Sequence, residues 1–407
     1  MRTPLGGPGG IHVYFWRPTM TTPSALITWQ PVLTDHQAYT YEALSRQSKT
    51  PVIAYVLTME DADRRAQGWK DTQVESIERR LIPARGGLAY CYQAMRKHRH
   101  DVHLFGSAFQ NARMLYCLLL ALLFRVEFYI VSEPYSPIAQ GYFSDKRLTL
   151  QKLKAILRPC LYSVYMTVLK GRMAGVFSIS SKAIAQYSNA GVEKNKLFPF
   201  GYFIPTLERH SPAPPDARIA DTPLSVVFVG ALIARKGLDV LVEAASLSNA
   251  PVKLDAYGPG DPSAFAFDNN TLRFRGTIPF GETQNVVSTY DVLVLPSRYD
   301  GWGVVVNEAL CAGVPVICSD QVGARVLVEK FGAGAVFDSE NTQALASLLN
   351  SLSANPEHLL AMRAGAQLAA AAIQPDVAAS YMLAVLRAKP EDKAAIASPW
   401  YSEQSSL

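Results

Sequence analysis

The sequence predicts an α/β protein with two domains, each built on a parallel sheet covered on both faces by helices. Three observations lead to this prediction. The chain has 407 residues, which is more than one ordinary hydrophobic core accommodates. Short β-rich runs alternate with helical stretches in two separate series. Between the two series lies a proline-rich segment without a hydrophobic period, residues 204–223, which we interpret as a linker.

The first series defines an N-terminal, Rossmann-like domain over residues 1–203. Its buried strands are expected in SALITWQ, PVIAYVLT, DVHLFGS, VEFYIVS and GVFSIS, and its helices in QAYTYEALSRQ, GGLAYCYQAMRKH and ARMLYCLLLALLF. The longest apolar run, residues 114–124, is too short to cross a bilayer. We therefore expect a buried helix there and no transmembrane helix.

Residues 151–172 combine five basic residues with an apolar stripe. The stripe consists of Leu153, Ile156, Leu157, Cys160 and Val164. A core-facing helix broken near Pro159 is the favoured interpretation. A helix that lies on a membrane surface is the alternative.

The second series defines a C-terminal, Rossmann-like domain over residues 224–375. Its strands are expected in LSVVFVGAL, PVKLDAYG, TLRFRGT, DVLVLPS and VPVICSD. Residues 376–407 are predicted to form a helix that crosses back to the first domain, followed by a loose tail, SPWYSEQSSL. A ligand site is expected between the domains, at the carboxyl ends of the strands.

Composition and cysteine usage limit the class of protein. Apolar residues make up 49% of the chain and charged residues 18%, which suits two sizeable cores. The five cysteines are odd in number and include no Cys-x-x-Cys pair, so we expect neither a disulfide framework nor a structural zinc site. The N-terminal Gly/Pro stretch does not resemble a secretory signal. These features predict a cytoplasmic protein.

The net charge of +5 conceals an asymmetry between the two halves. Residues 1–200 carry 25 Lys/Arg against 13 Asp/Glu, a balance of +12, whereas the remainder carries −7. A basic half indicates an anionic partner. Because no dense Lys/Arg tract is interleaved with aromatic residues, we favour an anionic membrane surface or a phosphorylated lipid acceptor over nucleic acid.

The most informative stretch is PSRYDGWGVVVNEALCAGVPVICSD, residues 296–320. A strand ends at Pro296 and a glycine-rich turn leads into a helix, whose free N–H groups and dipole suit a diphosphate. Asp300 precedes the turn and Glu308 lies about one helical turn inside the helix, where two carboxylates hold sugar hydroxyls at the two ends of a donor. The other residues predicted to line this site are Gly301, Gly303, Val304 and Val305.

A second site follows the first strand of the same domain, in FVGALIARKGLDVL, residues 228–241. Gly230 permits a tight turn, and Arg235 and Lys236 supply adjacent cations at the start of the next helix. Such a pair neutralises a departing diphosphate without a metal ion. A third glycine turn, AYGPGD, contains Gly258, for which a ligand contact and a plain turn are equally expected.

These stretches resemble the donor domain of GT-B glycosyltransferases, specifically family 4, the large retaining group 1 glycosyltransferases. The pattern of a carboxylate, seven residues and a glutamate is present as Asp300 and Glu308, and the G-x-L-x-x-x-K-G loop as Gly230, Leu232, Lys236 and Gly237. The resemblance covers residues 175–350. It implies a GT-B fold, in which two Rossmann-like domains have parallel sheets facing across a cleft, with residues 1–203 as the acceptor domain and residues 224–375 as the nucleotide-sugar donor domain.

The resemblance also implies roles for individual residues. Glu308 is expected to hold the ribose of the donor, Asp300 the transferred hexose, and Lys236 with Arg235 the diphosphate. The loop of Gly276, Thr277 and Ile278 is expected to meet the base. The implied donor substrate is a nucleotide-diphosphate sugar, with no cofactor and no metal required. Two departures are Asp300, where the family usually has Glu, and Ala231, where many members have Arg.

The first half matches the family only in its strand–helix rhythm. Where many members have a histidine after a central strand, this chain reads YIVSEPYSP. Glu133, at the end of that strand, and His103, in DVHLFGS, are the candidates for the acceptor side. For His103, a strand-end residue satisfied by backbone is the favoured alternative. The DAD sequence at residues 61–63 mimics a metal site, but we interpret it as a solvated loop.

The implied function is that of a retaining glycosyltransferase that moves a hexose to an acceptor hydroxyl in surface polysaccharide or lipid-linked glycan synthesis. A peripheral location on the inner face of the cytoplasmic membrane fits the basic half. Two alternatives stay open: a nucleotide-sugar epimerase of similar fold, and a non-catalytic nucleotide-sugar-binding scaffold.

Overall fold

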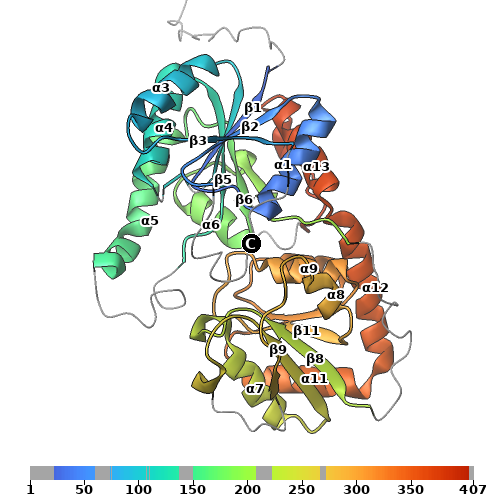
Figure 1. Ribbon diagram of the computed structural model, residues 1–407. Helices are drawn as coiled ribbons and strands as arrows, with labels where there is room; N and C mark the ends of the chain where they lie inside the picture. Colours follow the sequence, from blue (N-terminus) through green and yellow to red (C-terminus); the bar gives the residue numbers. More distant parts are fainter. Residues whose placement is uncertain are drawn as a thin grey trace, which may run out of the picture.

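The chain folds into two α/β domains, each with one parallel sheet between layers of helices (Figure 1). The computed structural model describes residues 23–59, 74, 76–106, 108–109, 111–136, 150–207, 222–265 and 272–402. Residues 61–63, whose DAD sequence we interpret as a loop, lie outside the described residues. The predicted fold class, two Rossmann-like domains with parallel sheets, is confirmed.

The first domain contains a seven-stranded sheet in the order β3-β2-β1-β4-β5-β6-β7, with every described pair parallel. All five residues of β1, LITWQ, are buried, as expected for a central strand with helices on both faces. The strands are β1 (Leu26–Gln30), β2 (Val52–Val56), β3 (Glu78–Leu81), β4 (Val102–Gly106), β5 (Glu127–Ser132), β6 (Gly175–Ile179) and β7 (Leu197–Phe200). The helices are α1 (Asp35–Ser48), α3 (Gly87–Lys97), α4 (Ala112–Phe124), α5 (Leu150–Leu169) and α6 (Ser181–Asn189).

The second domain contains a six-stranded parallel sheet in the order β10-β9-β8-β11-β12-β13. The order reverses between β8 and β11, the kind of position at which open α/β sheets bind ligands. Its strands are β8 (Leu224–Val229), β9 (Val252–Tyr257), β10 (Leu272–Phe274), β11 (Val292–Leu295), β12 (Val316–Ser319) and β13 (Gly334–Phe337). Its helices are α7 (Leu238–Leu247), α8 (Thr283–Val287), α9 (Val304–Cys311), α10 (Arg325–Phe331), α11 (Thr342–Ala354) and α12 (Pro356–Ala372).

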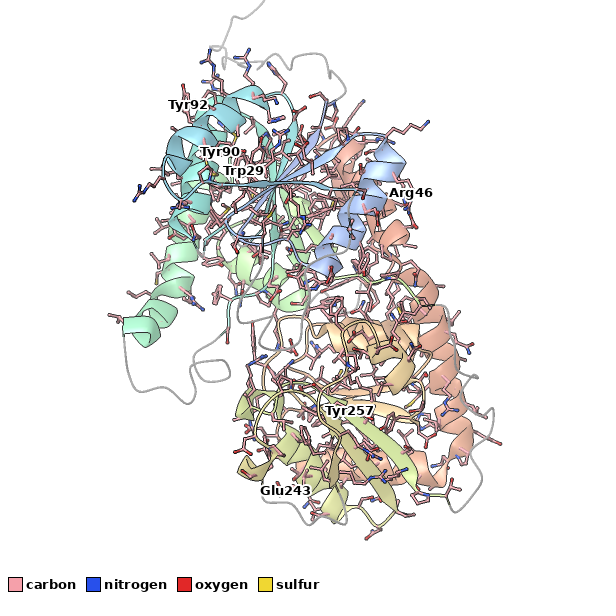
Figure 2. All side chains as sticks on the ribbon, in the orientation of Figure 1. Trp29, Arg46, Tyr90, Tyr92, Glu243 and Tyr257 are labelled. Atoms are coloured by element: carbon pink, nitrogen blue, oxygen red, sulfur yellow. The ribbon has the colours of Figure 1, made fainter. Side chains whose placement is uncertain are left out.

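The last helix, α13 (Pro375–Arg387), packs against α1 of the first domain (Figure 1). Arg46, labelled on α1 in Figure 2, forms an ion pair with Asp376. Ser380 Oγ donates a hydrogen bond to Gln47 Oε1 at 2.9 Å. The chain therefore crosses between the domains twice, once through residues 201–207 and once through α12 and α13.

Among the described helices, none is by itself long and apolar enough to cross a membrane. The pair α12 and α13 meets the length and composition requirements only when the two are joined, and the pair is bent by 52°.

The described part of the predicted tail, residues 398–402, packs into the core instead of being loose, and residues 403–407 lie outside the described residues. Trp400 is fully buried, and its ring centroid lies 4.3 Å from that of Phe203 and 5.3 Å from that of Tyr381. Lys330 Nζ donates to the carbonyl oxygen of Tyr401 at 2.8 Å, which fixes the backbone after the tryptophan. The prediction failed because most residues of this segment are polar, and we gave too little weight to the two aromatic side chains, Trp400 and Tyr401, which are buried.

Two sequence-based expectations about apolar helices need correction. The helix α5 is continuous through Pro159 and not broken there. Its stripe, predicted to face the core, is exposed at Leu153, Ile156, Leu157, Cys160 and Val164. The helix α4 buries one face, but Leu119 and Leu123 on it are exposed.

Candidate functional site at the domain junction

The turns that follow β8, β9 and β10 lie against one another, because the carboxyl ends of parallel strands meet at one edge of a sheet. Gly230 N donates to Tyr257 O, and Gly258 N donates to Gly276 O, both at 2.9 Å. A Cβ atom on Gly258, where φ is +147°, would lie 1.9 Å from Gly230 O. Glycine at this position is therefore required by the close approach of two turns, whether or not it touches a ligand.

Lys236 and Asp300, predicted to serve the same donor, contact each other directly. Lys236 Nζ lies 2.5 Å from Asp300 Oδ2, and both side chains are largely buried. The neighbouring Arg235 Nη1 donates to the carbonyl oxygen of Tyr299 at 2.8 Å. The turn after β8 is thus joined to the turn after β11, and cations and a carboxylate lie together beside the start of α9.

The start of α9 is formed by the glycine turn that the sequence predicts. Gly303 is the N-cap residue and has φ +92°, a conformation that favours glycine. Gly301 is buried, whereas Val304 and Val305, the first two helical residues, are half-buried. Since the first N–H groups of a helix have no partner within it, this end offers donors and a positive dipole to an anion.

Glu308 lies one helical turn further along α9 and is half-buried. Burial raises the pKa of its carboxyl group to about 7, against a smaller opposing effect from a hydrogen bond with Thr283. Thr283 begins α8, which follows the loop predicted to meet the base. Glu308 is therefore adjacent to α8, whereas Asp300 is adjacent to Lys236.

The loop of Gly276, Thr277 and Ile278 lies at the end of β10, beyond the turns of β8 and β9. Gly276 has φ +79°, and a Cβ atom built on it would meet no atom within 4 Å. Thr277 is exposed and Ile278 is half-buried. The base-binding role of this loop stays a prediction.

Glu133, predicted for the acceptor side, reaches across to the second domain. Tyr202 donates a hydrogen bond to Glu133 Oε1. A Cβ atom on Gly301 would lie 2.7 Å from Glu133 Oε2, so the carboxylate rests on the glycine turn before α9. The structure thus brings Glu133 to the same turn as Asp300.

His103, the other candidate for the acceptor side, does not reach this junction, in keeping with the structural role that was its favoured alternative. It is fully buried in the first-domain core, where Trp29 Nε1 donates to its Nδ1 and its Nε2 bonds to the carbonyl oxygen of His98, both at 2.9 Å. Burial lowers its pKa to about 4. A neutral histidine with both ring nitrogens bonded has a structural role. Trp29, which holds it, is labelled within the first domain in Figure 2.

Lys182 is a residue of the junction that the sequence analysis missed. It lies in the first turn of α6, and its Nζ donates to the carbonyl oxygen of Gln321 at 2.9 Å and to Gln321 Oε1 at 2.7 Å. Burial lowers its pKa to about 8. The sequence could have indicated Lys182 by its position directly after β6, because a helix that follows a parallel strand begins at the edge of the sheet where ligands bind.

Further hydrogen bonds join the two domains near these residues. Tyr299 donates from its hydroxyl to the carbonyl oxygen of Pro134 at 3.0 Å. Asn307 accepts from Trp302 Nε1 at 2.8 Å and donates to the carbonyl oxygen of Tyr202 at 2.9 Å. The segment from Tyr299 to α9 is therefore bonded to Pro134, which follows Glu133 in the chain, and to Tyr202, which donates to the Glu133 carboxylate.

Within the part of the chain that the structure describes, no group of three or more His, Cys, Asp and Glu side chains is arranged to hold a metal ion.

Comparison with known proteins matches the second domain to a family. Residues 213–368 match the model of the glycosyl transferases group 1. A putative teichuronic acid biosynthesis glycosyltransferase, TuaC, from Bacillus subtilis is 36% identical over 118 residues, which are 29% of this chain and 28% of that protein. A D-inositol 3-phosphate glycosyltransferase from Xylanimonas cellulosilytica is 29% identical over 216 residues, which are 48% of this chain and 52% of that protein. The chain thus spans about half or less of the length of these curated relatives.

Solved structures resemble the whole chain in fold. The Anabaena protein Alr3699/HepE, solved in complex with UDP, has a TM-score of 0.63 at 13% identity and covers 89% of this chain and 99% of its own. A sucrose-phosphate synthase from Thermosynechococcus elongatus has a TM-score of 0.62 at 17% identity and covers 89% and 98%. Residues 213–368 are therefore similar to the group 1 glycosyl transferases, and the chain has the two-domain GT-B fold of these solved structures.

Proposed function

We propose that this protein is a retaining glycosyltransferase that transfers a hexose from a nucleotide-diphosphate sugar to an acceptor hydroxyl. The observation that carries the proposal is the contact between Lys236 and Asp300 beside the start of α9, with Glu133 of the first domain on the same turn. A cation, a helix N-terminus and two carboxylates at one place suit a sugar diphosphate, because the charge that develops on the leaving group needs fixed donors.

Each residue has a part in this proposal. The diphosphate lies against Lys236, Arg235 and the N–H groups of α9, and it competes with Asp300 for Lys236. Asp300, once released, accepts hydrogen bonds from the hexose, and Glu308 accepts from the ribose. Both roles need ionised carboxylates, which accept hydrogen bonds more strongly than neutral acids.

The proposal includes transfer without a divalent metal, because the positive charge is supplied by the chain itself. We further propose a lipid-linked or surface-polysaccharide acceptor, and hence a cytoplasmic enzyme at the inner face of the membrane. The UDP bound by the similar Anabaena protein makes UDP-sugars the first donors to test.

The test is a transfer assay with UDP-, GDP- and ADP-hexoses, with and without acceptors, in which nucleotide release and the anomeric configuration of the product are measured. Lys236→Ala and Glu308→Ala should each abolish transfer while the fold is retained. Lys253→Ala, which removes an exposed lysine from β9 of the same domain, is the matched control and should retain activity.

Three outcomes would contradict the proposal. Near-full activity of Lys236→Ala or Glu308→Ala would refute the site. A modified nucleotide sugar formed without any acceptor would indicate an epimerase. Tight donor binding with no turnover on any acceptor would indicate a scaffold. Loss of transfer in the presence of EDTA would refute only the metal-independent part.

A further inference from the structure

The helix α5 carries apolar residues on two opposite sides. Tyr162, Met166 and Leu169 face the first-domain core and are buried. An α-helix turns by about 100° per residue, so positions near residues 157, 164 and 168 project to the opposite side. The exposed apolar residues there are Leu153 (52%), Ile156 (55%), Leu157 (46%), Leu161 (40%), Val164 (60%) and Val168 (57%).

Two neighbouring helices extend this surface. Leu88 and Tyr92 on α3 and Leu119 and Leu123 on α4 are also exposed, between 40% and 70%. The helices α3 and α4 pack together, with the ring centroids of Tyr92 and Phe124 5.3 Å apart. Figure 1 shows α3, α4 and α5 along one side of the first domain. We call the ten exposed apolar residues on these three helices the α3–α4–α5 face.

The α3–α4–α5 face has a pronounced charge bias. The sequences of α3, α4 and α5 contain no Asp and no Glu, and residues 85–172 contain 13 Lys/Arg against 4 Asp/Glu. One of these four acids, Asp101, is buried and bonded to His98 and Ser24. Exposed cations lie at or just beyond the C-terminal ends of the three helices: Arg96, Lys97, Arg125, Lys170 and Arg172.

Charge decides which occupant fits this face. A second copy of the chain, docked face to face, would bring cations against cations, which is unfavourable. An anionic bilayer surface accepts aliphatic side chains at the level of the acyl boundary and attracts lysine and arginine at the headgroups. We propose that the α3–α4–α5 face binds the surface of an anionic phospholipid bilayer.

The proposal is tested with vesicles and the full chain, without any transfer assay, so its outcome is separate from that of the proposed function. We expect the protein to float with phosphatidylcholine/phosphatidylglycerol (7:3) vesicles, to bind pure phosphatidylcholine vesicles more weakly, and to be released by salt. The variant Leu157→Ser/Val164→Ser/Val168→Ser should reduce binding at least about tenfold, because it replaces three aliphatic side chains that would be buried in the bilayer surface.

A matched control separates this face from general surface hydrophobicity. Leu247→Ser/Leu360→Ser/Leu368→Ser removes three exposed leucines from the second domain and should leave vesicle binding unchanged. A second variant, Lys97→Gln/Arg125→Gln/Lys170→Gln, changes only exposed cations and should reduce binding to the anionic vesicles while leaving the weaker binding to phosphatidylcholine unaltered.

The proposal is overturned if the protein does not bind anionic vesicles, or if the α5 variant and the cation variant both bind as the unmodified protein does. It is also overturned if light scattering shows that the α5 variant converts a dimer into a monomer while vesicle binding is unchanged. That result would assign the face to a second copy of the chain. Thermal melts of each variant establish that the fold is intact.

Discussion

Gly301 of the second domain lies directly under the carboxylate of Glu133 of the first, so that a methyl group on Gly301 would come within 2.7 Å of Glu133 Oε2. The atom that it would meet is the end of a flexible side chain. Gly301→Ala should therefore cost little stability but displace the Glu133 carboxylate.

We predict that Gly301→Ala lowers kcat/KM for transfer at least about tenfold, since small misplacements in an active site are costly. The melting temperature should change by no more than a few degrees. Gly171→Ala, where a Cβ atom would meet no atom within 4 Å and φ is not positive, is the stability control. Activity equal to that of the unmodified protein would show that the position of Glu133 does not matter for transfer.

Asp300 provides a second prediction, because its carboxylate holds Lys236 when no donor is bound. Asp300→Ala removes the group proposed to bind the hexose and at the same time releases Lys236 for the diphosphate. We expect kcat to fall roughly 100-fold or more. The Kd for the nucleoside diphosphate, measured by calorimetry, should be unchanged or lower. A strong loss of nucleotide affinity would instead show that Asp300 positions Lys236.

Much of the arrangement of this candidate site could be predicted from sequence because its parts are local. The spacing of Asp300 and Glu308 is set by one turn and one helix, and the meeting of Lys236 with Asp300 follows from strands whose carboxyl ends share an edge. The alternation of strands and helices also predicted the parallel sheets. The edge strand β3, ERRL, was not predicted, because it contains only one hydrophobic residue.

Contacts that depend on how the domains are oriented could not be predicted. The bond from Lys182 to Gln321 joins residues 139 positions apart, and nothing in either local sequence specifies the partner. For His103 the sequence left two interpretations open, because a strand's sequence does not say which way a side chain points when both faces of the sheet are buried; in the structure it is bonded to Trp29 within the first domain.

Glu308 leads to a prediction on pH. Its pKa is about 7 in the folded protein against an ordinary value of 4.5, so the folded state binds more protons than the unfolded state between these values. The free energy of unfolding should therefore decrease as pH rises from about 4.5 to 7 and stay lower above it. Because the side chain is only half-buried and is screened by solvent, the decrease is at most about 3 kcal/mol.

The variant Glu308→Gln removes this ionisation. It should be more stable than the unmodified protein at pH 8, and its advantage should shrink toward pH 5, as measured by urea unfolding at the two pH values. At the same time its affinity for a nucleotide sugar should fall. If Glu308→Gln exceeds the unmodified protein in free energy of unfolding by the same amount at both pH values, the pKa of Glu308 is not raised in the folded protein.

The last prediction concerns Trp400, whose indole ring packs on Phe203 between the domains and on Tyr381 of α13. Trp400→Ala should lower the free energy of unfolding by about 3 to 5 kcal/mol, the usual cost of emptying a large aromatic site in a core. Leu368→Ala, at a side chain that is 65% exposed, serves as the control and should change the free energy of unfolding by less than about 1 kcal/mol.

Because Trp400 contacts the segment that joins the domains, Trp400→Ala should also increase hydrogen exchange in residues 201–207 and in α13. Exchange that increased only after residue 396 would show that Trp400 anchors its own segment and does not stabilise the domain connection.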